Sequence, residues 1–350
     1  MNEWLLYGAN GYTGALIAHE ARARGMTPIL AGRNRDAVVS LAQELHLPYR
    51  VFALDDANTL RNALHEVGLV LHCAGPFSRT ARAMAQACIA NGTHYLDITG
   101  ELAVFEQLAR MDKTARAANV MLLPGIGFDV VPTDCLAAHL KMRLPGATHL
   151  TLAWRGIGRA SRGTTRTALE GAGQGGAIRR DGKIIPVPAA HKTRQVDFGR
   201  GPVTVVSIPW GDVSTAFYST GIPNIEVYTA FPASMRRAMI ASRYAKFLLN
   251  AKPVQRALAA QIKRLPPGPT AEERARGLSL VWGEVRDAQN NTRVSRLKTP
   301  EGYELTMLTA LAAVEKILRG ESKPGFQTPS LAFGADFILQ IPNVTRTDVE

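Results

Sequence analysis

The sequence predicts an α/β protein that begins with a doubly wound parallel sheet. Six short apolar runs occur in the first 125 residues, and none alternates apolar with polar positions, which is typical of strands buried on both faces. Helix-like stretches with apolar residues three or four positions apart separate these runs. A glycine-rich turn joins the first run to the first helix. Together these observations predict successive strand–helix–strand units in one sheet.

The expected strands and helices alternate without a long loop between them. Strands are expected at residues 3–7, 28–31, 49–53, 69–73, 94–98 and 120–123. Helices are expected at residues 13–24, 35–45, 57–66, 79–91 and 102–118. Gly25 and Gly92 directly follow two of these helices, where glycine commonly ends a helix.

Length and composition are those of a globular protein with two domains, or with one large domain that carries an insertion. The chain has 350 residues, 46% hydrophobic and 20% charged, which excludes collagen-like, coiled-coil and disordered classes. Its longest apolar stretches fall short of the roughly 20 residues of a membrane span, and a signal peptide is not expected. Cys73, Cys88 and Cys135 suit neither a disulfide framework nor a zinc site. We therefore expect a cytoplasmic protein without a membrane span.

Positive charge is concentrated in one segment. The chain has a formal net charge of +12, and residues 155–200 hold ten lysines and arginines against three acidic residues. Such a segment is suited to nucleic acid, acidic lipid headgroups, or an anionic substrate or carrier protein. A solvated basic loop is the alternative of equal weight, and the scarcity of aromatic residues there disfavours nucleic acid.

The glycine-rich turn predicts a dinucleotide site. Its sequence is GANGYTG at residues 8–14, a GxxGxxG spacing that is one residue longer than the common GxGxxG. The glycines permit a tight turn and a close approach of the backbone, and the amide groups that begin the next helix face a pyrophosphate. We expect the cofactor to contact Gly8, Asn10, Gly11, Tyr12, Thr13 and Gly14.

The end of the second expected strand favours NADP(H) over NAD(H). An acidic residue usually stands here when the cofactor lacks a 2′-phosphate, whereas a 2′-phosphate needs positive charge. No carboxylate follows the strand before Asp36, and Arg33 offers a planar donor fork suited to phosphate. We expect Arg33 and Asn34 to contact the cofactor. Asp55, after the third strand, is expected either to accept from the adenine amino group or to cap the helix that starts at Ala57.

Small residues after the fourth expected strand let the cofactor cross the edge of the sheet. Cys73, Ala74, Gly75 and Pro76 stand there, and we expect all four to line the cofactor site. Cys73 is expected to pack as a small apolar residue rather than to act as a nucleophile, because no nearby sequence feature would lower its pKa.

Several motifs together resemble one known group of enzymes. They are GANGYTG, AGRNR, HCAGPFSRTARAMAQACIANGTHYLDITGE, PGIGFDVVPTD and GFQTPSLAFGADFIL. With these motifs the chain resembles the saccharopine dehydrogenase-like oxidoreductases, and among them the bacterial trans-acting enoyl reductases. The resemblance implies an NADP-binding Rossmann domain at residues 1–125 and a second α/β domain with a mixed sheet at residues 126–303. It also implies a C-terminal helix and tail, residues 304–350, that return to the first domain.

The remaining sequence agrees with a second α/β domain. Further strands are expected at residues 148–155, 203–208, 225–231, 278–285 and 292–298. Helices are expected at residues 161–175, at 233–264 with a break at Pro253, and at 304–319 with Gly320 as the stop.

A reductase of C=C or C=N bonds needs a proton donor positioned beside its hydride source. Residues 95–101, 125–134 and 154–165 are expected near the edge of the first sheet where that chemistry takes place. Asp129 is the expected catalytic residue, and Gly125 and Gly127 are expected to allow contact with a flat ring. Asp129 and Asp134 would equally suit a helix start, as caps or first-turn acids.

The sequence therefore predicts an NADPH-dependent reductase with a hydrophobic or carrier-linked small-molecule substrate. The alternative is a non-catalytic NADPH-binding protein with a regulatory or interaction role. Family members act on an amino-acid adduct or on polyketide-derived and isoprenoid double bonds, so the resemblance leaves the substrate open. The eight histidines show no metal-ligand spacing, so no metal is expected. The oligomeric state is left open, with a homo-oligomer among the options.

Overall fold

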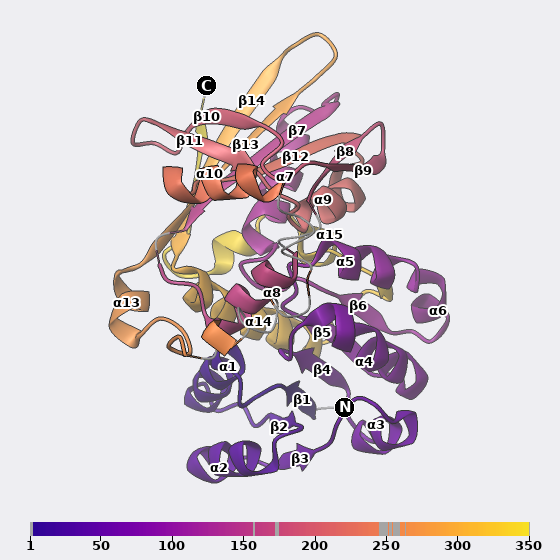
Figure 1. Cartoon of the computed structure of the whole chain (residues 1–350). Coiled ribbons are helices and arrows are strands. Elements are labelled where there is room, and N and C mark those ends of the chain that lie inside the picture. Colours follow the sequence, from indigo (N-terminus) through magenta and orange to yellow (C-terminus); the bar gives the residue numbers. More distant parts are fainter. Residues whose placement is uncertain are drawn as a thin grey trace. The chain divides into compact units, whose positions relative to one another are not determined.

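The computed structural model describes residues 3–156, 158–171, 175–244, 251, 254, 260–262 and 264–349. The chain forms two compact units. Unit 1 consists of Met1–Val131 and Tyr303–Ala332, and unit 2 consists of Pro132–Gly302 and Phe333–Glu350. Figure 1 shows the helices and strands of both.

Unit 1 contains a seven-stranded parallel sheet in the order β15-β6-β5-β4-β1-β2-β3. Strands β1 to β6 lie in the order β6-β5-β4-β1-β2-β3, which is that of a Rossmann fold and confirms the predicted doubly wound sheet. The strands are β1 (Trp4–Tyr7), β2 (Ile29–Gly32), β3 (Tyr49–Val51), β4 (Leu69–His72), β5 (His94–Asp97), β6 (Met121–Leu123) and β15 (Gly325–Phe326).

Helices cover both faces of this sheet (Figure 1). The helix α1 (Tyr12–Ala23) contacts α2 (Arg35–Leu45), and α4 (Phe77–Asn91) contacts both α3 (Ala57–Ala63) and α5 (Leu102–Ala109). Leu60 of α3, Met84 of α4 and Leu108 of α5 are buried in one core with Val70 and Tyr95 of the sheet. Burial of each such apolar side chain stabilises the fold by about 1.5–3 kcal/mol.

The expected helix at residues 102–118 is two helices, α5 and α6 (Asp112–Ala117). The Met111 N–H donates to the Leu108 carbonyl, three residues back, and this tighter turn ends α5. The Asp112 carboxylate accepts from Arg116 Nε at 2.8 Å and from the Phe326 N–H at 2.8 Å. The break therefore allows the start of α6 to bind β15 through a side chain.

The helix α14 (Gly302–Leu318) confirms the one expected at residues 304–319. It lies beside α1, where Arg24 Nη1 is 3.2 Å from Glu315 Oε1. Gly320 follows it with a φ of 91°, the left-handed conformation that glycine adopts most easily.

Unit 2 contains a nine-stranded sheet that runs β10-β11-β12-β7-β13-β14-β16, with β8 beside β12 and β9 beside β8. The pairing of β12 with β7 is parallel, and the neighbouring pairings on both sides are antiparallel, which confirms the predicted mixed sheet. The strands are β7 (His149–Gly156), β8 (Gly176–Arg180), β9 (Lys183–Val187), β10 (Thr193–Asp197), β11 (Pro202–Ser207), β12 (Asn224–Thr229), β13 (Leu278–Arg286), β14 (Thr292–Pro300) and β16 (Thr345–Val349).

Gly283 of β13 allows a helix to pack closely on this sheet. A Cβ on Gly283 would lie 2.6 Å from Leu140 Cδ1 and 3.1 Å from Leu136 Cδ2, both on α7. The remaining helical elements of the described residues are α7 (Val131–Arg143), α8 (Arg162–Gly171), α9 (Asp212–Thr220), α10 (Ala233–Ser242), α13 (Ala271–Arg276), α15 (Pro329–Phe333) and the 3-10 helix η1 (Phe337–Gln340).

The hairpin of β8 and β9 was not expected from the sequence, although a local signal marks it. Asp181 and Gly182 form its turn with φ angles of 49° and 76°. An Asp-Gly pair is a common choice where both central turn residues need a positive φ. Arg180 and Lys183 flank this pair directly and Pro186 interrupts the second strand, so the two strands are hard to recognise in the sequence.

The C-terminal tail departs from the expected arrangement. Residues 303–332 belong to unit 1, but residues 333–350 belong to unit 2. Their strand β16 pairs antiparallel with β14 and covers backbone groups that would otherwise form an open sheet edge. The Asp348 carboxylate adds a side-chain contact, accepting from Ser295 Oγ at 2.6 Å.

Parts of two expected helices lie outside the described residues. The helix expected at residues 161–175 is present as α8, and residues 172–174 lie outside the described residues. Of the stretch 233–264, α10 is present, whereas Pro253 and most residues from 245 onward are outside it. Among the helices that the structure describes, none is long and apolar enough to cross a membrane.

Candidate cofactor and active site

The glycine-rich loop joins β1 to α1, and two of its glycines are required by the fold. Gly8 has a φ of 83°, and its N–H donates to the Ala31 carbonyl of β2 at 2.7 Å. A Cβ on Gly8 would lie 2.8 Å from the Ala74 nitrogen, and a Cβ on Gly14 would collide with the Gly8 carbonyl oxygen. The loop can therefore fold against β4 and α1 only with glycine at positions 8 and 14.

Gly11 differs, because a larger residue there would need only a small shift of the backbone. Its φ of −77° and ψ of 163° suit any residue, and a Cβ would meet only the Gly8 carbonyl oxygen, at 3.2 Å. Gly11 is exposed and forms the N-terminal cap position of α1. Tyr12 and Thr13 form the first turn of that helix. The open space at Gly11 fits a pyrophosphate held by the amide groups of a helix N-terminus.

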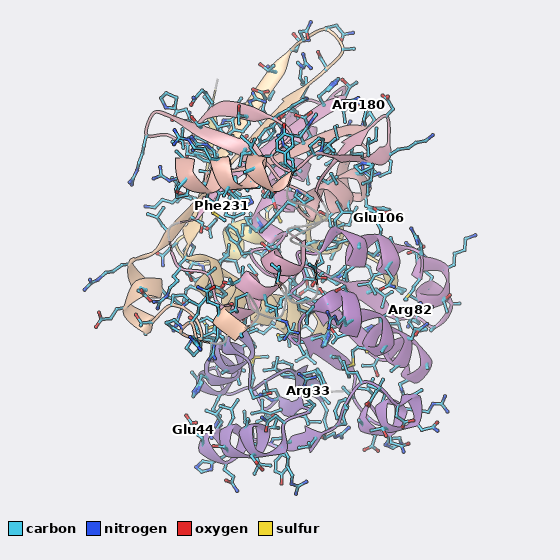
Figure 2. The ribbon with its side chains drawn as sticks, viewed as in Figure 1. Arg33, Glu44, Arg82, Glu106, Arg180 and Phe231 are labelled. Carbon is cyan, nitrogen blue, oxygen red and sulfur yellow. The ribbon has the colours of Figure 1, made fainter. Side chains whose placement is uncertain are left out.

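Arg33 and Asn34 follow β2 directly. The Arg33 side chain is exposed in unit 1, where Figure 2 labels it. Asn10 of the glycine-rich loop lies nearby, since a Cβ on Gly32 would be 2.9 Å from Asn10 Oδ1. Asn34 has a structural role as well, because its side chain accepts from the Ala37 N–H at 3.2 Å and caps α2.

Of the two roles expected for Asp55, capping of α3 and contact with adenine, the structure excludes the first. The N-cap of α3 is Asp56, whose carboxylate accepts from the Thr59 N–H at 2.6 Å. The capping role that the sequence allowed for Asp55 is therefore wrong. Asp55 is exposed, and its contact with adenine stays a prediction.

The segment after β4 lies against the glycine-rich loop. A Cβ on Gly8 would be 2.9 Å from both the Ala74 Cβ and the Cys73 carbonyl carbon. Burial raises the pKa of the Cys73 thiol, and the Asp97 charge raises it further. Cys73 is consequently a poor nucleophile, in agreement with its expected packing role. Gly75 and Pro76 lead into α4.

Glu101 caps α4, although it lies outside that helix in the sequence. Its two carboxylate oxygens accept from the Phe77 N–H at 2.8 Å and from the Ser78 N–H at 2.9 Å. Pro76, at the N-cap position, has no side chain that could do this. The negative charge of Glu101 also complements the dipole of α4, whose start follows the expected cofactor segment.

Asp97 holds the ends of two neighbouring strands together. Its side chain is fully buried, and it accepts from Tyr95 Oη at 2.7 Å, from the Thr99 N–H at 2.9 Å and from the Gly125 N–H at 3.0 Å. Burial raises its pKa to about 6, even though these hydrogen bonds act in the opposite direction. One carboxylate thus fixes both the loop after β5 and the loop after β6.

Asp129 lies in the second of these loops, against Gly100 of the first. A Cβ on Gly100 would be 2.5 Å from Asp129 Oδ2. The Asp129 side chain is half-buried, and burial raises its pKa to about 7. Within the described residues its carboxyl has no hydrogen-bond or ion-pair partner. The structure therefore gives no support to a capping role for Asp129.

The loop that carries Asp129 is fastened to α14. The Phe128 N–H donates to Thr306 Oγ1 at 2.9 Å, and Thr309 Oγ1 donates to the Ile126 carbonyl at 2.9 Å. A Cβ on Gly127 would lie 2.8 Å from Thr306 Cγ2. Sequence reasoning missed both threonines, because no local pattern links them to a loop about 180 residues earlier.

Gly125 and Gly127 do not serve the purpose that was expected of them. Gly125 has a φ of 71°, and a Cβ there would lie 2.7 Å from Phe105 Cζ. Phe105 and Thr306 fill the space beside these two glycines. The expectation of open contact with a flat ring is corrected accordingly, because the glycines allow the loop itself to pack.

Two further candidates have structural roles in unit 2. Asp134 is buried in the first turn of α7 and accepts a hydrogen bond from Ser219 Oγ. Ser161 Oγ accepts from the Thr164 N–H at 3.2 Å, as a cap of α8 does. Within the described residues no cluster of three or more metal-binding side chains is present.

Much of the charge in the basic segment is used inside unit 2. Arg179 is buried over the Phe217 ring and donates to the Val213 carbonyl. Arg194 binds both carboxylate oxygens of Glu284, at 2.8 and 3.0 Å. Arg180 at the end of β8 is exposed, and Figure 2 labels it. These contacts favour a structural and solvated segment over a nucleic-acid surface.

Comparisons with known proteins identify the first unit. Residues 4–123 match the family described as "Saccharopine dehydrogenase NADP binding domain". The chain is 31% identical over 148 residues to a trans-acting enoyl reductase of Mycobacterium leprae, which covers 40% of this chain and 35% of that protein. It is 25% identical over 202 residues to a saccharopine dehydrogenase-like oxidoreductase of Mus musculus, which covers 50% and 47%. The chain thus spans less than two thirds of these relatives.

The fold of the whole chain has a solved counterpart. The saccharopine dehydrogenase (L-Glu forming) of Saccharomyces cerevisiae matches with a TM-score of 0.68 over 100% of both chains, at 11% sequence identity. At that identity the match shows the fold alone. The match of residues 4–123 confirms the resemblance of this part of the chain to the saccharopine dehydrogenase family and confirms NADP(H) as the cofactor.

Proposed function

We propose that this chain, which carries a saccharopine dehydrogenase NADP-binding domain, is an NADPH-dependent reductase of a polarised C=C or C=N bond. The Asp129 carboxyl is the observation that carries the proposal. It is half-buried, has no partner within the described residues, and has a pKa of about 7. A carboxyl that keeps its proton near neutral pH is suited to general-acid chemistry.

The residues of unit 1 fit NADPH, which supplies a hydride when bound. Gly11 leaves open the space that a pyrophosphate needs at the start of α1. Arg33 is exposed after β2 and would bind the 2′-phosphate, with Asp55 near the adenine. The other residues that would hold the cofactor are Gly8, Asn10, Tyr12, Thr13, Gly14, Asn34, Cys73, Ala74, Gly75 and Pro76.

Asp129 would complete the reduction by donating its proton to the atom of the double bond that does not receive the hydride. Asp97 would act as a positioning residue. Its buried carboxylate fixes Thr99 in the loop that carries Gly100 and Gly125 in the loop that carries Asp129, and these two loops meet at Gly100 and Asp129. After the transfer, the exposed part of the Asp129 carboxyl would recover a proton from water. The net change is the addition of one hydride and one proton across the double bond.

A hydrophobic or carrier-linked substrate suits this reaction class. A relative named as a trans-acting enoyl reductase supports a C=C substrate, and the family name supports a C=N substrate as the other choice. The three cysteines are free, which suits a reducing compartment such as the cytoplasm.

The test is NADPH oxidation by the purified full chain with a panel of trans-2-enoyl thioesters and cyclic imines. We expect loss of NADPH absorbance with at least one class, and a product heavier by two hydrogens in mass spectrometry. Asp129→Asn should bind NADPH with unchanged affinity but reduce the same compound far more slowly. Tight NADPH binding without oxidation by any compound would contradict the proposal and favour a non-catalytic NADPH-binding role.

A further inference from the structure

A threonine of α4 holds the segment that joins β4 to this helix, residues 73–76. Its hydroxyl, Thr80 Oγ1, donates to the Ala74 carbonyl at 2.8 Å and lies 3.2 Å from the Pro76 carbonyl oxygen. The contact with Pro76 is the one that a helical threonine commonly makes with the carbonyl four residues earlier. Both carbonyl groups therefore point toward Thr80, and the segment is fixed from the side of α4.

His72, the last residue of β4, donates to this threonine. A hydroxyl has one hydrogen, and Thr80 gives it to a carbonyl, which can only accept. His72 Nε2, which is 2.9 Å from Thr80 Oγ1, must therefore carry a hydrogen and donate it. The ring is neutral, because burial lowers the pKa of His72 to about 3. The result is a chain of three groups, imidazole, hydroxyl and carbonyl, in which each group donates to the next.

Packing alone does not account for a histidine at position 72. Its side chain is 0% exposed, and its ring lies 5.4 to 6.2 Å from those of Tyr7, Phe77 and Tyr95. Its other nitrogen, Nδ1, has no hydrogen-bond partner within the described residues. A buried acceptor without a partner destabilises the fold, and an apolar side chain would avoid this cost. The feature that distinguishes histidine here is the hydrogen that Nε2 gives to Thr80.

The fixed carbonyl of Ala74 also sets the direction of the next amide group. The bond between Ala74 and Gly75 is trans, so the Gly75 N–H points away from that carbonyl and from Thr80. Gly75 is exposed, and its N–H has no hydrogen-bond partner in the part of the chain that the structure describes. The N–H is therefore a free donor at the carboxyl end of β4, where a doubly wound sheet binds its ligand.

From these contacts we infer that His72 and Thr80 are positioning residues for NADPH, which direct the Gly75 N–H toward an oxygen atom of the nicotinamide half of the cofactor. That half consists of the nicotinamide, its ribose and the phosphate attached to this ribose. His72 is fully buried and acts only through Thr80 and the Ala74 carbonyl. The inference rests on the proposed placement of NADPH along residues 73–76 and does not depend on which compound is reduced.

The test is calorimetric titration of the full chain with two ligands. One is NADPH, and the other is adenosine 2′,5′-bisphosphate, which has the adenine and the 2′-phosphate but lacks the nicotinamide half. Thr80→Val and His72→Phe should each weaken NADPH binding about 3- to 10-fold, the loss of one hydrogen bond, and leave binding of the bisphosphate unchanged. The double variant should lose no more affinity than Thr80→Val alone, because both residues act through one carbonyl.

Conservative variants provide the rescue. Thr80→Ser keeps the hydroxyl, and His72→Gln keeps an N–H donor of similar reach, so both should bind NADPH as the wild type does. Thr114→Val, at an exposed threonine of α6, is the matched control and should change nothing. An equal loss of affinity for both ligands would show a merely structural role and overturn the inference. Wild-type NADPH affinity in Thr80→Val, or an equal loss in Thr80→Ser, would also overturn it.

Nuclear magnetic resonance of a chain with isotope-labelled glycine observes the Gly75 N–H directly, with Gly75→Ala to assign its signal. The amide proton should move downfield when NADPH binds and stay in place when the bisphosphate binds. A Gly75 signal that NADPH does not move would overturn the inference.

NADPH oxidation in the same samples separates this inference from the proposed reaction. NADPH that binds more weakly to Thr80→Val but reduces no compound with the wild type would contradict the reductase and support the positioning role. Reduction by the wild type, together with unchanged NADPH affinity in Thr80→Val and His72→Phe, would support the reductase and overturn the positioning role.

Discussion

Replacement of Asp129 by asparagine should remove a pH dependence of stability and activity that the wild type shows and that a capping aspartate would not produce. Burial raises the pKa of Asp129 from 3.8 to about 7. That difference corresponds to a cost of about 4 kcal/mol for ionising the carboxyl in the folded chain. The value is an upper limit, because the side chain is only half-buried and water screens its exposed part.

The sign of the effect follows from the direction of the shift. A carboxyl whose pKa is raised on folding contributes stability that is complete below about pH 4 and is lost as the pH rises through about 7. Asparagine cannot ionise and avoids this loss. The free energy of unfolding of Asp129→Asn should therefore exceed that of the wild type by about 0.5 kcal/mol near pH 4 and by up to about 4 kcal/mol near pH 9.

Urea unfolding of both proteins at a series of pH values measures this difference. A capping carboxylate would have a lowered pKa, and the wild type would then gain stability with rising pH relative to the variant. A difference that is constant with pH, or that grows in that opposite direction, would refute the reasoning.

Activity should follow the same ionisation. If Asp129 donates the proton, kcat/KM of the wild type should fall as the pH rises above about 7, where the carboxyl loses its proton. Asp129→Asn should be about 10²- to 10⁴-fold slower and should lack this fall. A wild-type rate in the variant would remove Asp129 from the chemistry.

Three further predictions concern the geometry of unit 1. Gly100→Ala places a Cβ 2.5 Å from Asp129 Oδ2. It should displace that carboxyl and lower turnover at least tenfold without a change in NADPH affinity; unchanged turnover would contradict the contact. Gly11→Val should abolish NADPH binding and keep the fold, whereas Gly14→Ala should lower Tm; a loss of fold in Gly11→Val would contradict the assignment. Arg33→Asp should weaken NADPH binding by several-fold to about 100-fold, as expected for loss of a charge-assisted contact, and should relieve discrimination against NADH in calorimetric titration. Equal wild-type affinity for NADH and NADPH would refute the role of Arg33.

The predictions from sequence were correct where the signal is local. Strands buried on both faces read as short apolar runs, and this pattern located six of the seven strands of the Rossmann sheet, β1 to β6; the two-residue strand β15 was not expected. Helix ends were found where glycine follows, as at Gly92, which has a φ of 69°. The hairpin of β8 and β9 was missed because the Asp181-Gly182 turn is a two-residue signal, and charged residues and Pro186 interrupt the short strands on either side of it.

The roles of single site residues were harder to predict, because several alternatives satisfied the same pattern. Either Asp55 or Asp56 could cap α3, and only the backbone geometry assigned the cap to Asp56. Gly125 and Gly127 suggested contact with a ligand, but Phe105 and Thr306 occupy the space beside them. A glycine in a sequence indicates that another group packs close to the backbone, but the sequence does not show whether that group is a ligand or a side chain of the same protein.

By itself, the sequence determined the fold class of unit 1 and indicated its dinucleotide cofactor, because both are visible in the strand–glycine loop–helix order of neighbouring residues. Only the tertiary structure decided how Asp129 is placed. Its raised pKa comes from burial, and its position comes from Gly100, from Asp97 through Gly125, and from α14 through Thr306. Burial and contacts between residues distant along the chain arise only when the elements pack together.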